Sequence, residues 1–297
     1  ASAAAAAGHF DVAQWLESAA GAEASAASAH DASAAAAPRV LRFQVSEREA
    51  PPRTSGPPTG ASETFAAWEA LADLDAAVDQ AAGAPGSGGD IEGCSWVETL
   101  AEATAAVEAL RGDLVAGARP PLLGVDVECC EDVICTVQVS TFARNVVFDA
   151  LRLHDALGGE LREVFSDPAI LKVFHAPRND LRWLSMNFGL EVVGLFDTAA
   201  AARELAEVRA EARAAAAGLP APGPGADPGL KGVCREHLQV KLDKTFQRAD
   251  WRLRPLPREM LRYAARDSAV LVPLARALAA QLAAEGRLAS CHAACAR

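Results

Sequence analysis

Two carboxylates in an apolar, strand-like run are the first residues whose spacing suggests chemistry. Asp126 and Glu128 lie two residues apart in LLGVDVE, so a strand would place both side chains on one face. The apolar neighbours predict burial, and two buried carboxylates are costly unless a positive charge neutralises them. A divalent cation that prefers oxygen ligands, Mg²⁺ or Mn²⁺, would do so. The alternative is a solvent-facing edge strand with a polar stripe.

Three further residues could join such a site. Asp180 begins a predicted helix just after a strand over 170–175, where the carboxyl end of a strand meets the crevice in which α/β sheets bind ligands. Tyr263 and Asp267 are four residues apart in YAARD and share one helix face. Taken singly, Asp180 is typical of a helix cap, and the other pair is typical of a surface hydrogen bond. Tyr263 is nevertheless the only tyrosine among 297 residues.

The elements that must position these residues read as a mixed α/β layer. Three β-rich runs with very short connections favour an antiparallel meander: 122–128, 133–140 and 145–150. Helices and strands then alternate, which favours parallel crossovers: helices over 154–165, 178–187 and 198–217, and strands over 170–175 and 192–197. The remaining predicted elements are a helix over 95–112 with a capping box at Thr99, a loop over 218–229, a short helix over 230–238 and one long helix over 257–284.

Residues 1–90 differ in composition from the rest of the chain. They are rich in Ala, Ser, Pro and Gly and predict a low-complexity, largely flexible segment with one or two helices, one of them over 65–81. Residues 91–297 would form one folded domain. The chain begins without Met and is expected to be a piece of a longer protein or a processed one. No signal peptide, transit peptide or membrane span is predicted.

The formal charge of −11 argues against nucleic-acid binding by the whole surface and against a polybasic membrane binder. A local basic groove stays open as a prediction. The seven cysteines are irregularly spaced, with no CxxC pair, and fit free thiols better than a disulfide framework.

Taken in order, three segments resemble the exonuclease motifs of the DEDD superfamily, in its tyrosine-containing branch. They are GVDVE with Asp126 and Glu128, VFHAPRNDLRWL with Asp180, and YAARD with Tyr263 and Asp267. Flanking strings, above all LDKTFQRADWRLRPLP, are similar to the ribonuclease D branch and especially to the nuclear-exosome 3′–5′ exoribonucleases. The resemblance covers residues 94–285.

This resemblance implies a ribonuclease H-like fold, in which three antiparallel strands precede parallel strands and helices flank the sheet. It also implies a site for two divalent cations, Mg²⁺ or Mn²⁺. Asp126, Glu128 and Asp267 would hold one ion, Asp126 would bridge to the second, and Asp180 would hold the second largely through water. Tyr263 would position the attacking water, so that all five residues would be catalytic.

The resemblance also suggests residues that contact RNA. Six candidates lie in family-like strings: His175, Lys244, Gln247, Trp251, Arg252 and Arg254. Such residues would hold a single strand by stacking and by positive charge. The alternative for Trp251 and the arginines is that they pack and pin the loop before the last helix, and the alternative for His175 is a place in the core.

Three functions stay open at this point. The first is a 3′–5′ exoribonuclease acting on single-stranded RNA 3′ ends in RNA processing or degradation, in the nucleus with RNA exosome subunits as partners; an organelle or the cytoplasm is also open. The second is a DNA 3′–5′ exonuclease. The third is a catalytically inactive nuclease fold that binds RNA or serves as a scaffold. Only CCED separates Glu128 from the next strand, a shorter hairpin than the family usually has, and it adds Glu131 and Asp132 near a site for phosphates.

Overall fold

The computed structural model describes residues 39–40, 61–72, 94–117, 120–220, 223 and 225–295. Most of the predicted low-complexity segment lies outside these residues. Within it, the structure describes the short strand β1 (Arg39–Val40) and the helix α2 (Ala61–Ala72). The helix predicted over 65–81 is therefore present up to Ala72, and its remainder lies outside the described residues.

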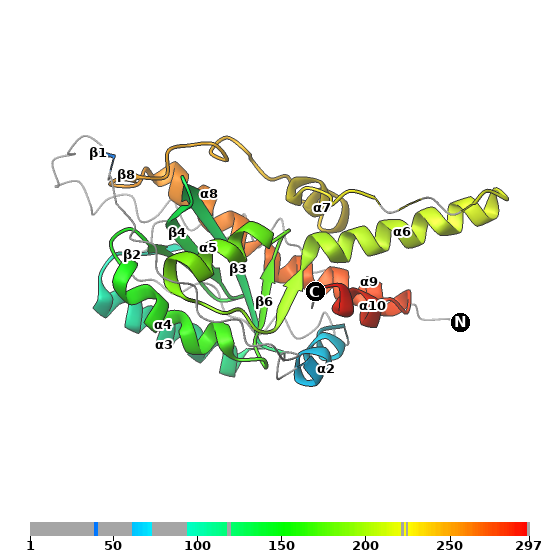
Figure 1. Ribbon diagram of the computed structural model, residues 1–297, viewed down its shortest axis with the longest axis horizontal. Coiled ribbons are helices and arrows are strands. Elements are labelled where there is room, and N and C mark those ends of the chain that lie inside the picture. Colours follow the sequence, from blue (N-terminus) through cyan, green and yellow to red (C-terminus); the bar gives the residue numbers. More distant parts are fainter. Residues whose placement is uncertain are drawn as a thin grey trace, which may run out of the picture.

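A six-stranded mixed sheet forms the centre of the fold (Figure 1). Its strand order is β2-β5-β4-β3-β6-β7, in which β3, β4 and β5 are antiparallel neighbours while β6 and β7 continue parallel to β3. The strands are β2 (Cys94–Val97), β3 (Leu122–Cys130), β4 (Val133–Ser140), β5 (Asn145–Asp149), β6 (Leu171–Phe174) and β7 (Leu195–Asp197). This arrangement confirms the predicted meander followed by parallel crossovers.

The edge strand β2 is a correction to the sequence analysis, which placed 95–112 in one helix. Residues Cys94–Val97 instead extend the sheet by pairing in parallel with β5. The stretch is β-prone, and as a strand it buries the side chains of Cys94 and Val97. The helix α3 (Leu100–Ala116) begins only after Thr99, whose hydroxyl accepts from the backbone N–H of Glu102 in the predicted capping box.

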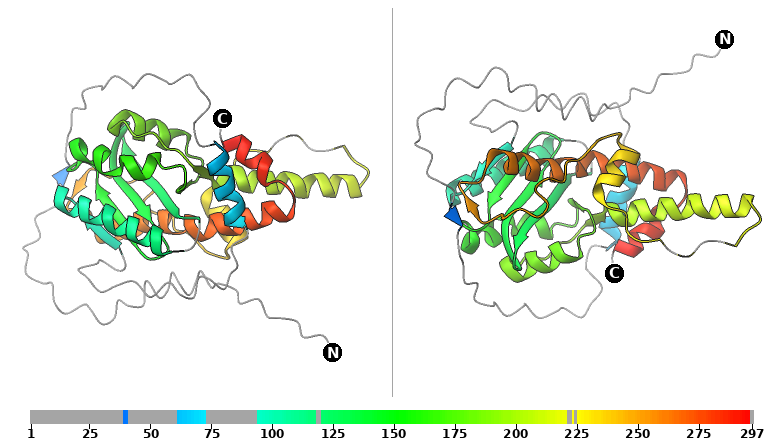
Figure 2. Two further views of the ribbon diagram at one scale, coloured as in Figure 1. Left: turned by 90° about the horizontal axis from the view of Figure 1, so that it is seen from below. Right: turned by 90° about the horizontal axis from the view of Figure 1, so that it is seen from above.

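Helices cover both faces of the sheet (Figures 1 and 2). One face packs against α3, α4 (His154–Ser166) and α5 (Arg178–Phe188). The other packs against α8 (Arg258–Ala269) and α9 (Leu271–Ala284). The other described elements are α6 (Thr198–Ala216), which extends away from the body in Figure 2, α7 (Leu230–His237), β8 (Leu253–Arg254) and α10 (Leu288–Cys295).

The last long helix is interrupted, which corrects the prediction of one helix over 257–284. The structure has two helices, α8 and α9, that meet at Val270. Pro273 lies in the first turn of α9, where its missing N–H cannot bond to the carbonyl of Ala269. By length and composition the combined stretch Arg258–Ala284 could cross a membrane, but 67% of its apolar window is buried inside the fold, as in a core helix.

Candidate active site

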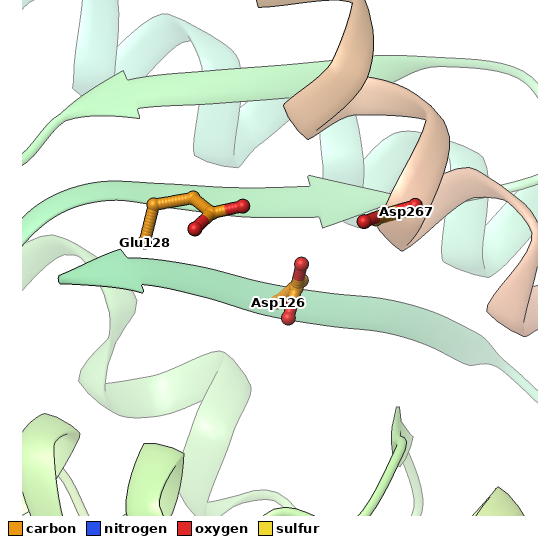
Figure 3. Close-up of side chains that lie close together, drawn as sticks. All are labelled: Asp126, Glu128 and Asp267. Carbon is orange, nitrogen blue, oxygen red and sulfur yellow. The ribbon is translucent and has the colours of Figure 1, made fainter. Parts of the chain in front are cut away.

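Three carboxylates converge between the sheet and α8 (Figure 3). Asp126 and Glu128 project from β3, and Asp267 projects from α8. One oxygen atom from each of the three lies within 4.8 Å of the others. Neighbouring residues of β3, such as Val125 and Val127, pack on the opposite face with α3, α4 and α5. The two-residue alternation along β3 therefore places the two acids on the α8 side, as predicted.

A close approach between α8 and β3 brings Asp267 to the strand. Gly124 lies where a Cβ atom would overlap the backbone carbonyl oxygen of Ser268 and would lie 3.2 Å from Cγ2 of Val272. The hydroxyls of Ser140 and Ser268 are 2.7 Å apart and join α8 to β4. Only glycine leaves room for this contact, so position 124 determines how near Asp267 can come to the carboxylates of β3.

The clustered carboxylates are destabilised as anions. Burial is the main cause that raises the pKa of Glu128 to about 8, with a further contribution from Asp267. Burial and then the neighbouring Glu128 raise the pKa of Asp126 well above its usual range. Burial also raises the pKa of Asp267, although Lys244 opposes this shift. The carboxylates of such a site stay ionised when cations neutralise their charge, and otherwise they take up protons.

The donor set fits a hard divalent cation. Three carboxylates within one ion's reach, Asp267 buried and the other two partly exposed, offer the oxygen ligands that Mg²⁺ and Mn²⁺ prefer. Asp180 lies outside this three-carboxylate group, in the first turn of α5. Its charge still raises the pKa values of Asp126 and Glu128, so it lies within electrostatic reach of the group. Burial, followed by Asp197, raises the pKa of Asp180 itself to about 7.

Tyr263 lies next to the carboxylates and is 8% exposed. Its hydroxyl donates a hydrogen bond to Asp267, one helical turn along α8. Burial raises the pKa of Tyr263, so the phenol keeps its proton. The rings of Phe246 and Trp251 flank it, each with its centroid 6.0 Å from that of Tyr263. These contacts fix the direction in which the hydroxyl points.

Lys244 is the RNA-contact candidate that the structure brings to the carboxylates. Its Nζ lies 3.7 Å from Oδ2 of Asp267. Its positive charge lowers the pKa values of Asp267 and Glu128 against the effect of burial. The side chain is 28% exposed, so it borders both the cluster and solvent. Gln247 lies in the same segment and is exposed.

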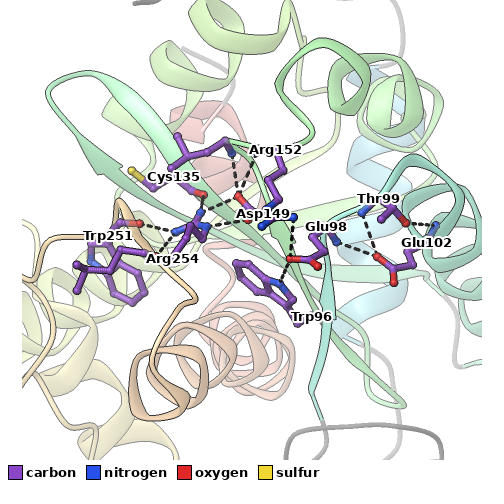
Figure 4. A network of polar contacts seen from close by, with 11 residues as sticks. Trp96, Glu98, Thr99, Glu102, Cys135, Asp149, Arg152, Trp251 and Arg254 are labelled. Atoms are coloured by element: carbon purple, nitrogen blue, oxygen red, sulfur yellow. Dashed lines mark hydrogen bonds and ion pairs between the residues drawn. The ribbon is translucent and has the colours of Figure 1, made fainter. Parts of the chain in front are cut away.

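Arg254 and Trp251 lie in the interior (Figure 4). The guanidinium of Arg254 donates to both carboxylate oxygens of Asp149 at 2.7 Å, to the carbonyl of Cys135 and to that of Trp251. These contacts favour the packing alternative for both residues, because a guanidinium fully engaged inside the fold has no donor left for RNA. Arg252 is half-buried and forms two hydrogen bonds to the carboxylate of Asp250.

His175 holds the loop between α6 and α7. Its Nε2 donates to the carbonyl oxygen of Pro228 at 2.8 Å, and its Nδ1 lies 2.9 Å from Oγ1 of Thr198. Burial lowers the pKa of His175. Both ring nitrogens are thus engaged within the protein, which favours the core alternative for this residue.

The sequence analysis did not single out Asp197, although it secures the turn before Asp180. Its carboxylate accepts from the backbone N–H groups of Ala176 and Ala199, both at 2.9 Å. Ala176 has a φ of 53°, a left-handed conformation that this hydrogen bond helps to hold. An acid at the end of a strand and just before a helix, in LFDT, was the available signal.

The short hairpin after Glu128 is fixed to α5. Its turn residues, Glu131 and Asp132, have φ values of 53° and 64°. The carboxylate of Asp132 accepts from Nε1 of Trp183 at 2.7 Å, and Asn187 donates to its carbonyl at 3.0 Å. The charge of Asp132 is also paired with Arg182 at 3.1 Å. This acid of the hairpin is therefore engaged with α5.

Comparisons with known proteins identify relatives of this chain. A family model described as a 3′–5′ exonuclease matches residues 94–283. Exosome complex component 10 of Rattus norvegicus is 38% identical over 138 residues, which cover 46% of this chain and 13% of that protein. The exosome complex exonuclease RRP6 of Saccharomyces cerevisiae is 33% identical over 182 residues, which cover 60% and 21%. The chain thus spans about a fifth or less of the length of these two relatives.

A solved structure shares the fold. The catalytic core of RRP6 from Trypanosoma brucei superposes with a TM-score of 0.56 at 30% sequence identity, covering 68% of this chain and 50% of that one. The mixed sheet and its flanking helices are therefore shared with a crystallographically known nuclease core.

Proposed function

Since this chain belongs to the 3′–5′ exonuclease family, we propose that it is a metal-dependent 3′–5′ exoribonuclease that trims single-stranded RNA. The observation that carries the proposal is the convergence of Asp126, Glu128 and Asp267, with Asp180 beside them and Tyr263 bonded to Asp267. The relatives named as exosome components favour RNA over DNA as the substrate. They also favour the RNA exosome as partner and the nucleus as compartment.

The carboxylates would hold two divalent cations, Mg²⁺ or Mn²⁺, which supply charge neutralisation at the phosphodiester and a lower pKa for the attacking water. Asp126, Glu128 and Asp267 form the central ligand group, and Asp180 borders it. Tyr263 acts by orientation, because a phenol that keeps its proton can donate or direct a hydrogen bond but cannot serve as a base.

Lys244 is the best placed of the candidate RNA contacts. Its ammonium adds positive charge at the edge of the acidic cluster, where a substrate phosphate must approach. An unpaired 3′ end suits this site because a single strand can bring its terminal phosphodiester to the carboxylates, whereas a duplex end would have to open first.

A 5′-labelled single-stranded RNA incubated with Mg²⁺ tests the proposal. We expect a ladder of products shortened one nucleotide at a time from the 3′ end, and no products with EDTA. Asp126→Asn should abolish the ladder without unfolding the domain. Asp155→Asn is the matched control, because that side chain is 95% exposed on α4 and should leave activity intact. A ladder that persists in Asp126→Asn would sink the mechanism.

The same assay separates the other functions. Faster trimming of DNA than of RNA would identify a DNA exonuclease. RNA binding by the wild-type chain with no ladder at any Mg²⁺ or Mn²⁺ concentration would identify a nuclease fold that serves as a binding module or scaffold.

A further inference from the structure

Positive charge in this acidic chain is concentrated in one segment. Residues 241–266 contain eight Lys and Arg but three Asp and Glu, whereas the whole chain contains 28 and 39. The segment covers the stretch before β8, β8 itself and most of α8. It ends one residue before Asp267, so the charge concentration lies directly beside the carboxylate cluster.

Solvent exposure divides these eight cations into two groups. Arg252 and Arg254 are neutralised by Asp250 and Asp149, and Lys244 faces Asp267. The other five are exposed, and we call them the basic surface: Lys241, Arg248, Arg258, Arg262 and Arg266.

Three members of the basic surface form a row on α8. Arg258, Arg262 and Arg266 recur every fourth residue, so they share one side of the helix at intervals of about 6 Å along its axis. The sheet-facing side of α8 carries the buried Leu261, Tyr263 and other core residues. The row therefore faces solvent while Tyr263 and Asp267 face the site.

The row is continuous with the segment that carries Lys244. The guanidinium of Arg266 donates to the carbonyl of Lys241 at 3.2 Å, which holds these two cations together. Phe246 packs edge-on against Tyr263, so the segment before β8 lies against α8, as in Figure 1. Arg266 is close enough to Asp267 that its charge lowers the pKa of that carboxyl.

We propose that the basic surface binds the phosphate backbone of the RNA upstream of the 3′ end that is being trimmed. This proposal rests on the proposed function and adds a second contact region to it. A row of cations at helical spacing, beginning beside the metal ligands, suits a polyanionic strand that leaves the site along α8. Arg258 and Arg266 lie about 12 Å apart along the helix axis, so only an RNA of several nucleotides can reach the whole row.

The test is a triple variant, Arg258→Gln, Arg262→Gln and Arg266→Gln, measured by fluorescence anisotropy over a range of salt concentrations. For a single-stranded RNA of about 20 nucleotides, we expect the slope of log K against log salt to become shallower by about 2, since each phosphate contact contributes about 0.7 on single strands. At about 0.1 M salt this slope change corresponds to a loss of affinity of about 10²-fold. Trimming of a dinucleotide should fall much less than trimming of the long RNA, because a dinucleotide reaches only the end of the row beside Asp267.

The matched control is the triple variant Arg111→Gln, Arg162→Gln and Arg213→Gln, which removes the same charge from exposed positions on α3, α4 and α6. It should bind the long RNA with the wild-type salt slope. An equal loss in both triple variants would show only a net-charge effect and would overturn the proposal. Unchanged long-RNA affinity in the α8 variant would also overturn it and would point to an acidic protein as the partner of this surface.

The outcomes separate this inference from the proposed function. If the wild-type chain trims RNA and the α8 variant behaves like wild type, the inference alone fails. If the wild-type chain binds long RNA through the row but produces no ladder, the row is an RNA-binding surface and the proposed catalytic function fails.

Discussion

Gly124→Ala is expected to separate the two halves of the carboxylate cluster. The added methyl group would overlap the carbonyl oxygen of Ser268, a backbone atom that no side-chain rotation can move. Ordinary van der Waals separation is restored only if α8 moves away from β3 by about 1 Å. Asp267 moves with α8, whereas Asp126 and Glu128 stay on β3.

The magnitude follows from two separate effects. Overpacking of this kind costs about 1–3 kcal/mol of unfolding free energy. In a domain of this size that lowers Tm by about 2–4 °C for each kcal/mol. A displacement of about 1 Å among catalytic groups lowers turnover by about 10²-fold. Activity should therefore fall far more than the loss of folded protein can explain.

Gly158→Ala is the matched control. A Cβ atom there would overlap the carbonyl oxygen of Phe188, so the packing of α4 on α5 is disturbed in the same way. That contact lies at the end of α5 remote from Asp180. Trimming is measured at saturating Mg²⁺, at a temperature well below both Tm values. If Gly124→Ala and Gly158→Ala lose equal stability and keep equal activity, the close approach at Gly124 does not position Asp267, and the reasoning is refuted.

Three further predictions concern charge and hydrogen bonding. Because the pKa of Glu128 is raised to about 8 in the fold, the metal-free domain should lose stability as pH rises from about 5 to 8. Mg²⁺ should therefore raise Tm more at pH 8 than at pH 6. Scanning fluorimetry in EDTA and in Mg²⁺ measures both effects. Tyr263→Phe should lower turnover by about 10²-fold with little change in RNA affinity, whereas a large loss of affinity would indicate a structural role. Arg254→Gln should cost about 3–5 kcal/mol in urea unfolding because it leaves the buried Asp149 with only the more distant Arg152, at 3.7 Å, as a cationic partner. The control Arg252→Gln removes a pair whose side chains are 33% and 35% exposed, and it should cost about 1 kcal/mol, less than Arg254→Gln.

Local periodicity accounts for the parts of the site that the sequence could predict. The alternation along β3 is enough to place Asp126 and Glu128 on one face, and the four-residue helical interval is enough to pair Tyr263 with Asp267. Neither inference needs tertiary contacts. The bounds of β4 and β5 agree with the predicted runs 133–140 and 145–150 to within one residue, since short turns separate these β-rich runs.

Tertiary contacts account for what could not be predicted. Trp251, Arg252 and Arg254 lie in one family-like string, yet Arg254 is buried because its partner, Asp149, ends a strand far earlier in the chain. Nothing in the string distinguishes this arginine from Arg252, which reaches solvent. The strand β2 is another case: a four-residue run next to a capped helix becomes a strand because β5 offers a free edge.

The proposed binding of a polyanionic substrate by this acidic chain depends on how its charges are distributed and not on their sum. Four carboxylates at the site would repel phosphate, and burial raises their pKa values because their charge is uncompensated. Divalent cations held by these carboxylates would make the electrostatic potential at a substrate phosphate positive. The basic surface supplies attraction for the rest of the strand, while the excess of acids lies outside 241–266. Since electrostatic attraction between exposed charges decays within about 10 Å at moderate salt, the cations beside the site outweigh a net charge of −11 spread over the whole chain.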